Sequence, residues 1–218
     1  MPDPSPSEPY PPDEETEAEE SPRAIDPVLA YIILIVITVL GLRGLAVDVR
    51  YTIVWSLTTV IAVFSLLADR VDFSPPHPID LVVGSIFGGM VGVPLLAIGG
   101  SALKILSAAI FAKTSDTAAF LLLAFAMPLA ETAFFRGAMQ ASRGSIVTGL
   151  AASLWAVVLF SPQLDLRTYP FVALVIGLFF VFANFLYSYL RDRFGILSAW
   201  TCQITINLLL LFAARFVS

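Results

Sequence analysis

The sequence predicts an all-α membrane protein, a polytopic bundle of about seven transmembrane helices that follows a disordered acidic tail. Of its 218 residues, 58% are hydrophobic and only 13% are charged, whereas a soluble domain carries about 25% charged residues. The charged residues lie between long apolar stretches. The N-terminal residues 1–26 alone hold 9 of the 17 acidic residues.

The tail comprises residues 1–26, which are rich in Pro, Glu, Asp and Ser, and Arg23 is its only base. Such a segment buries too little apolar surface to offset the entropy of ordering, so we expect it to be disordered. It has no basic stretch followed by an apolar one, as a signal peptide would have. An acidic tail can bind a partner, here of unknown identity, but a solvated extension is the simpler interpretation.

The transmembrane domain comprises residues 27–218. A helix needs about 20 mostly apolar residues to cross a bilayer, and charges or prolines separate seven such stretches. A further apolar segment, residues 104–112, is too short to cross and either lies at the membrane interface or lengthens the third stretch. The seven stretches are residues 28–46, 51–68, 80–103, 117–140, 145–162, 170–190 and 195–216.

The composition also excludes several kinds of site. With one histidine, His77, and one cysteine, Cys202, the chain cannot form an ordinary zinc site, which needs three or four ligands. The single cysteine excludes an internal disulfide. No basic surface of the kind that binds nucleic acid is expected. We therefore expect no metal, cofactor or nucleic acid, and membrane lipids as the surroundings.

Away from the span ends, ionisable residues occur only in the fourth predicted span, as Glu131 and Arg136. Each costs at least about 2.5–3.5 kcal/mol at the bilayer centre, so each calls for a reason. On an ideal α-helix, positions five apart diverge by about 140°, so we do not expect the two side chains to stack as a pair. A carboxyl among apolar neighbours can serve as a general acid or base. Alternatively, the arginine reaches the membrane surface and the glutamate lies near the opposite end of a tilted helix.

The last predicted span carries two amides, Gln203 and Asn207, on one helical face, and Trp200 extends the stripe. Such amides either hydrogen-bond a neighbouring helix or line a polar cavity that faces Glu131. Asn184 and Ser188 have the same spacing in the sixth span, where helix packing is the favoured interpretation.

Glycines recur every four residues along the third span, at Gly84, Gly88 and Gly92. A stripe of small residues lets two helices approach closely. It therefore predicts packing and carries no chemistry.

The stretch from Glu131 to Gly137, Glu-Thr-Ala-Phe-Phe-Arg-Gly, resembles the first signature of the CAAX-protease and bacteriocin-processing (CPBP) family of intramembrane proteases. That signature is two glutamates, two variable residues and Phe-Arg-Gly. Here Thr132 replaces the second glutamate, and Phe135, Arg136 and Gly137 match.

Two further signatures of the family align with departures. The third, His-x-x-x-Asn, corresponds to Gln203 and Asn207, so the asparagine matches and the histidine does not. The second, Phe-x-x-x-His, should fall in SLWAVVLFSP, where its histidine position is Leu159 or Ser161. The resemblance covers about residues 117–210.

The resemblance implies that Glu131 activates a water molecule, that Asn207 stabilises an oxyanion and that Arg136 is a structural or electrostatic anchor. Gln203 would stand in the place of a catalytic histidine. The residues expected to line the cavity are Thr132, Phe135, Ser161 and Asn184.

Both family histidines are missing, and glutamine cannot take up a proton near neutral pH. Because loss of a general acid–base typically costs about 10²–10⁴ in rate, we expect a weakly active or inactive intramembrane endopeptidase homologue. It would bind a peptide or a lipidated protein tail as a multi-pass protein of a prokaryotic cell membrane. The alternatives are an active peptidase with altered chemistry, a small transporter or channel-like component, and a membrane scaffold.

Overall fold

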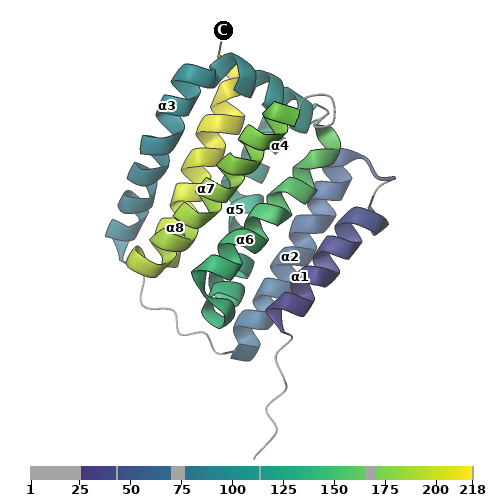
Figure 1. The fold of residues 1–218 in the computed structure, drawn as a ribbon, viewed down its shortest axis with the longest axis vertical. Helices are drawn as coiled ribbons and strands as arrows, with labels where there is room; N and C mark the ends of the chain where they lie inside the picture. Colours follow the sequence, from purple (N-terminus) through teal and green to yellow (C-terminus); the bar gives the residue numbers. More distant parts are fainter. Residues whose placement is uncertain (1–25, 43, 70–76, 113, 165–169, 218) are drawn as a thin grey trace, which may run out of the picture.

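The computed structural model describes residues 26–42, 44–69, 77–112, 114–164 and 170–217, and every element assigned within them is helical. The helices lie side by side along one common direction (Figure 1). The all-α prediction is therefore confirmed. Apart from Asp26, the predicted disordered tail lies outside the described residues.

Helices of three types make up the bundle. The α-helices are α1 (Pro27–Val36), α2 (Val47–Asp69), α3 (Pro78–Ile110), α4 (Asp116–Leu121), α5 (Met127–Glu131), α6 (Gln140–Phe160), α7 (Pro170–Phe194) and α8 (Ile196–Asn207). The π-helices are η1 (Ile37–Gly41), η2 (Leu122–Ala126), η3 (Thr132–Met139) and η5 (Leu208–Phe212). Two short 3₁₀-helices complete the set, η4 (Ser161–Gln163) and η6 (Ala213–Phe216).

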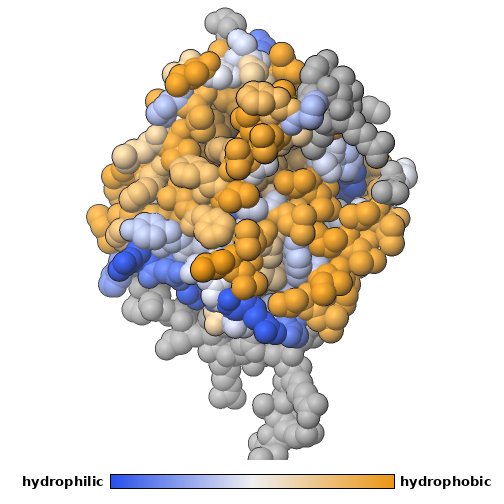
Figure 2. All heavy atoms as spheres, viewed as in Figure 1, coloured by the Kyte–Doolittle hydropathy of each residue, from blue (hydrophilic) through white to orange (hydrophobic). Residues whose placement is uncertain are grey.

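The outer surface is apolar to an extent that a soluble protein does not show. Ile98 is 88% exposed, Phe171 75% and Leu67 72%, and large exposed apolar surfaces mark contact with a membrane or partner. Figure 2 shows hydrophobic residues across the middle of one face and hydrophilic residues along its lower edge. This surface is compatible with a multi-pass integral membrane protein.

Five helical stretches are long and apolar enough to cross a membrane, judged by length and composition. A sixth apolar stretch, Pro27–Gly41, is shorter. The five stretches are Val47–Leu67, Pro78–Ile110, Asp116–Gln163, Pro170–Phe194 and Ile196–Phe216.

The stretch Asp116–Gln163 contains both the fourth and the fifth predicted span, because the chain reverses at Gly144. Gly144 has φ +76° and ψ 172°, in a region that favours glycine. The indole nitrogen of Trp155 lies 3.1 Å from Glu131 Oε1 although 24 residues separate them. A straight helix of that length would place them about 36 Å apart.

One predicted boundary differs from the structure. The first span was expected to reach residue 46, but the helix ends at Gly41 because Leu42 has φ −112° and ψ 8°. Of the two alternatives for residues 104–112, the structure shows the second: α3 continues to Ile110 and so lengthens the third span. Side chains hold this end against the chain terminus: Lys104 Nζ donates to the Val217 carbonyl (2.7 Å) and Ser107 Oγ to the Leu211 carbonyl (2.5 Å).

The glycine stripe of α3 packs against the last helical stretch, as predicted. A Cβ at Gly84 would meet Thr201, one at Gly88 would meet Thr205, and one at Gly92 would meet Leu209. Each partner lies 117 positions further along the chain, and a constant offset means that the two helices run parallel.

We predict that Gly88→Ala destabilises the fold, because the new Cβ would lie 2.6 Å from Thr205 Cβ and 2.9 Å from the Cys202 carbonyl oxygen. Overpacking of this kind typically lowers the free energy of unfolding by about 1–3 kcal/mol. In lipid nanodiscs it would appear as a lower thermal midpoint. The matched control is Gly89→Ala, whose Cβ would meet nothing within 4 Å. Equal destabilisation by both substitutions would contradict the close α3–α8 contact.

Candidate functional site

Glu131 lies at the end of α5 and is 7% exposed. Oε1 accepts a hydrogen bond from Trp155 Nε1 on α6 (3.1 Å) and a longer, weaker one from Trp55 Nε1 on α2 (3.5 Å). Oε2 accepts one from Gln203 Nε2 on α8 (2.7 Å). Three other helices thus direct N–H groups at one buried carboxyl.

The amide of Gln203 is held in one orientation. Thr132 Oγ1 donates to Gln203 Oε1 (3.1 Å), and this leaves Gln203 Nε2 facing Glu131. Of the two alternatives left open for this amide, the structure shows a hydrogen bond to a neighbouring helix, and its acceptor is Glu131 itself. Trp200, which was expected to extend the stripe, is only half-buried.

Asn207 lies one turn further along the same face of the last helical stretch, beside η2 and α5. Its Nδ2 approaches the Leu123 carbonyl oxygen (3.4 Å) and Met127 Sδ (3.7 Å). Both contacts are long for hydrogen bonds, so the amide hydrogens of Asn207 are only weakly engaged. We use the name Glu131 group for Glu131, Thr132, Trp55, Trp155 and Gln203. Asn207 lies one turn from Gln203 but does not bond to Glu131.

Arg136 belongs to a different group. It is 1% exposed, so its side chain does not reach the membrane surface. Its Nη2 donates to Asn184 Oδ1 (2.7 Å) and to the Asn184 carbonyl (3.1 Å). Its guanidinium carbon lies 5.5 Å from the ring centre of Tyr187 and 5.8 Å from that of Phe135, within the range of cation–π attraction. No ion pair within 4 Å joins it to Glu131.

The helix between these two groups is not an α-helix. Residues Thr132–Met139 form the π-helix η3, so the ideal α-geometry assumed from the sequence was wrong for this motif. Pro128, at the start of α5, has no N–H to continue the hydrogen-bond ladder from η2, so it marks the junction before α5 and gives no signal of η3. π-Helical turns occur frequently at functional sites.

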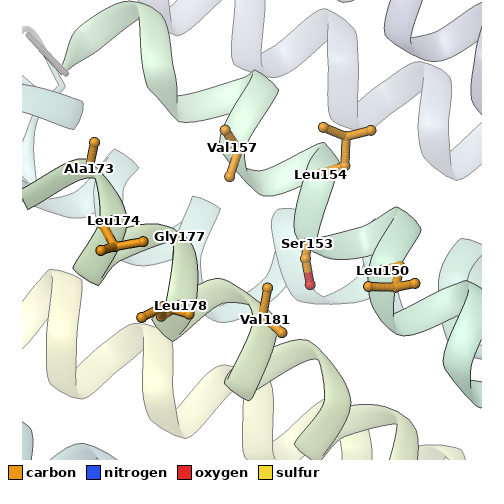
Figure 3. Close-up of a pocket in the computed structure, with 9 residues that line it drawn as sticks. All are labelled: Leu150, Ser153, Leu154, Val157, Ala173, Leu174, Gly177, Leu178 and Val181. Atoms are coloured by element: carbon orange, nitrogen blue, oxygen red, sulfur yellow. The ribbon is translucent and has the colours of Figure 1, made fainter. Parts of the chain in front are cut away.

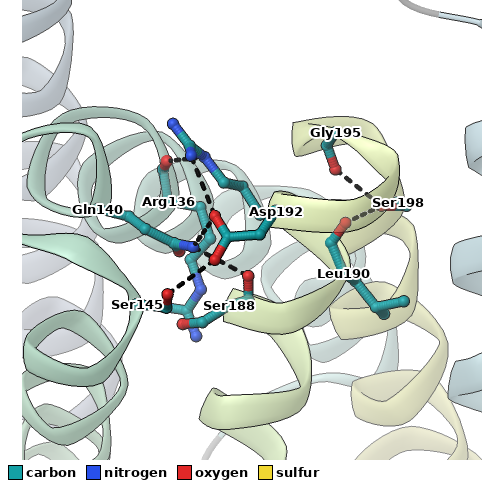
Figure 4. Close-up of polar contacts among 9 residues, drawn as sticks. Arg136, Gln140, Ser145, Ser188, Leu190, Asp192, Gly195 and Ser198 are labelled. Atoms are coloured by element: carbon teal, nitrogen blue, oxygen red, sulfur yellow. Dashed lines mark hydrogen bonds and ion pairs between the residues drawn. The ribbon is translucent and has the colours of Figure 1, made fainter.

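A polar ladder links η3 and the start of α6 to α7 (Figure 4). Arg136 bonds to Asn184, and four residues later Gln140 Nε2 donates to the Ser188 carbonyl (2.9 Å). The constant offset of 48 residues shows that η3 and α7 run parallel. We use the name polar ladder for Arg136, Gln140, Ser145, Asn184, Ser188 and Asp192.

The outer rung of the polar ladder is Asp192. It accepts hydrogen bonds from Gln140 Nε2 (2.8 Å), Ser145 Oγ (2.7 Å) and Arg191 Nη1 (3.2 Å). The sequence reasoning missed Gln140, Ser145 and Asp192. The four-residue spacing from Asn184 through Ser188 to Asp192, matched by Arg136 and Gln140, was the available signal.

The four residues expected to line a cavity are distributed differently. Thr132 lies in the Glu131 group and Asn184 in the polar ladder. Phe135 is buried with its ring centre 6.3 Å from that of Trp155. Ser161 is half-buried in η4, six residues beyond Trp155, or about 9 Å along the helix.

Leu159, the other residue at the position expected for the family histidine, is buried and has no role at Glu131. It is 1% exposed and its carbonyl accepts a hydrogen bond from Arg50 Nη2 (3.4 Å). No side chain in the described ranges therefore stands for the histidine of the second signature beside Glu131.

The described residues also offer no other histidine near Glu131 and no set of metal ligands. His77 is exposed just before α3, and its backbone N–H donates to Asp80 Oδ2 (3.2 Å). In this part of the chain, no three His, Cys, Asp or Glu side chains are grouped so that they could hold a metal ion.

A groove of about 440 Å³ opens between α6 and α7 (Figure 3). Its one polar side chain, Ser153, donates to the Gly149 carbonyl (2.6 Å) and the Phe180 carbonyl (3.3 Å). The groove faces outward, since Leu154 is 54% exposed, whereas Trp155 points inward to Glu131. The groove and the Glu131 group therefore lie on different faces of α6. The groove is lined by Leu150, Ser153, Leu154, Val157, Ala173, Leu174, Gly177, Leu178 and Val181.

Compared with known proteins, the chain matches no protein-family model, no curated protein and no solved structure.

We predict that Glu131→Leu lowers the free energy of unfolding. All three partners of the carboxyl are N–H donors, and leucine offers none of them an acceptor. An unsatisfied buried polar group costs about 1–3 kcal/mol, which thermal unfolding in nanodiscs would register.

The matched control is Asp116→Asn, which removes the exposed ion pair between Asp116 and Arg215 (2.7 Å). Such surface pairs contribute about 0–1 kcal/mol. If Glu131→Leu proves as mild as this control, the three-donor arrangement around Glu131 is refuted.

Proposed function

We propose that the protein crosses a membrane seven times and is a divergent homologue of the CAAX-protease and bacteriocin-processing endopeptidases. In this proposal its Glu131 centre binds a peptide or a lipidated protein tail and cleaves it slowly or not at all. The observation that carries the proposal is the 2.7 Å hydrogen bond between Gln203 and Glu131, because it joins the two positions that the sequence signatures pair.

Helix directions support seven crossings. In a chain that alternates direction, the third and seventh spans run parallel, and so do the fourth and sixth. The contacts agree: residues of α3 meet residues 117 positions later in the last helical stretch. Residues of η3 and the start of α6 meet residues 48 positions later in α7. The fourth and seventh spans should be antiparallel. Accordingly, Glu131 contacts Gln203 while Met127 contacts Asn207.

The short α1 fits as the first crossing, parallel to the fifth. Arg143 bonds to Asp26 (2.5 Å) and, further along both helices, Tyr31 Oη donates to the Ala151 carbonyl (2.9 Å). Figure 1 shows the C-terminus and the start of α1 at opposite ends of the bundle, as an odd number of crossings requires.

The chemistry available at Glu131 is that of a single general base. A carboxylate has about four acceptor positions, and Oε2 receives one hydrogen bond, from Gln203. A water molecule bound at the remaining position of Oε2 would lose a proton to Glu131 as it attacked a peptide carbonyl. The weakly engaged N–H groups of Asn207 are suited to stabilise the resulting oxyanion.

Turnover is limited by the return of the proton. Collapse of the tetrahedral intermediate requires a proton on the leaving amine nitrogen, and the family's histidine would assist this transfer. Gln203 can donate a hydrogen bond there but cannot release a proton. Glu131 alone must accept the proton and deliver it, which makes cleavage slow.

A transporter or channel-like role has less support. A solute path would need a continuous series of polar groups, whereas Glu131 and Arg136 lie in separate groups and each is bonded to a neighbouring helix.

We predict that Gln203→His raises cleavage of a prenylated peptide in nanodiscs by about 10²-fold over the wild type, because an imidazole supplies the missing acid–base group. Product formation is followed by mass spectrometry. Adding Glu131→Gln to this variant should remove the gain, since it removes the base.

The matched control is Gln163→His, which introduces the same side chain in η4. It should leave cleavage at the wild-type level. Cleavage that persists after Glu131→Gln, or a gain of equal size from Gln163→His, would contradict the role given to Glu131.

A further inference from the structure

We infer that ordered water is bound inside the bundle between η3 and α7, within the polar ladder. This hydration site is separate from the Glu131 group and does not depend on peptidase activity. It rests on three buried polar atoms whose hydrogen-bonding capacity no protein group satisfies: Arg136 Nε, Gln140 Oε1 and Ser188 Oγ.

The three atoms belong to adjacent rungs. Gln140 bonds directly to Ser188, and Arg136 and Asn184 form the rung one turn further in. Arg136 is 1% exposed, Gln140 3% and Ser188 0%. Figure 4 shows the Arg136, Gln140 and Ser188 side chains gathered between the two helices.

The orientation of Gln140 is fixed, which makes its free oxygen meaningful. Its Nε2 donates to the Ser188 carbonyl and to Asp192 Oδ1. Reversing the amide would place Oε1 against two acceptor oxygens. Oε1 is therefore a buried acceptor that lacks a donor.

The donor and acceptor properties of the three atoms indicate that the ligand is water. Arg136 Nε offers only a donor, Gln140 Oε1 only an acceptor, and Ser188 Oγ either. An anion would be repelled by the Gln140 oxygen, and a cation by the Arg136 guanidinium. Water serves donors and acceptors together, and a buried water molecule typically makes about three hydrogen bonds.

The polar ladder also provides a route for this water. Asp192, its outer rung, has a side chain that is 40% exposed, and Gln140 connects it directly to Ser188. Water would therefore enter from the end of the bundle that carries Gly144 and Gly195.

The first test compares two buried serines at this end of the bundle. Ser198 is also 0% exposed, but its Oγ donates to the Leu190 carbonyl (3.0 Å) and the Gly195 carbonyl (2.7 Å). If Ser188 were dry, Ser188→Ala would remove an unsatisfied group and leave stability unchanged or higher.

With bound water, Ser188→Ala should lower the thermal midpoint of the full chain in nanodiscs by about 2–4 °C. Ser198→Ala, which loses known hydrogen bonds, sets the scale for such a loss. A Ser188→Ala midpoint at or above that of the wild type overturns the inference.

The second test measures hydration directly, through the ionisation of an introduced thiol. In a Cys202→Ala background, Ser188→Cys and Ser198→Cys are each treated with methyl methanethiosulfonate, a small neutral reagent that reacts with the thiolate. If water is bound at Ser188, the thiol of Ser188→Cys should react at least about tenfold faster than that of Ser198→Cys. Equal rates for the two variants also overturn the inference, so both results are required.

Discussion

The structure depends on one buried carboxyl. Glu131 receives N–H groups from Trp55, Trp155 and Gln203, which lie on three separate helices. In a lipid environment the hydrophobic effect does not drive helices together, so packing and interhelical hydrogen bonds must do so. The three contacts to this carboxyl join four parts of the bundle, namely α2, α5, α6 and α8.

Arg136, the arginine of the same motif, forms interhelical hydrogen bonds with α7. Arg136 is held by Asn184 and lies beside the Tyr187 ring. A buried charge without an ionised partner is costly unless its donors are satisfied, and the carbonyl and amide oxygens of Asn184 satisfy part of that need. The motif therefore uses its two charged residues to contact different helices, and this explains why they do not pair with each other.

Much of the fold was predictable from the sequence, and the reasons are local. The stripe of Gly84, Gly88 and Gly92 predicted close packing, and the spacing of Gln203 and Asn207 predicted that both amides lie on one helical face. The polar ladder was not predicted, because it depends on the parallel approach of η3 and α7, and a single sequence does not show which spans are neighbours. The π-helix was missed because helical periodicity is read with α-geometry.

The π-helix has a consequence for how the motif tolerates change. Successive residues of any helix, including a π-helix, point in different directions around its axis, so an insertion or deletion between Glu131 and Arg136 would rotate one of these side chains relative to the other. One of the two side chains would then lose its neighbours, even if every amino acid type were preserved. The spacing between the two charges is thus as much a part of the site as their identity, and this segment should accept exchanges of side chains more readily than changes of length.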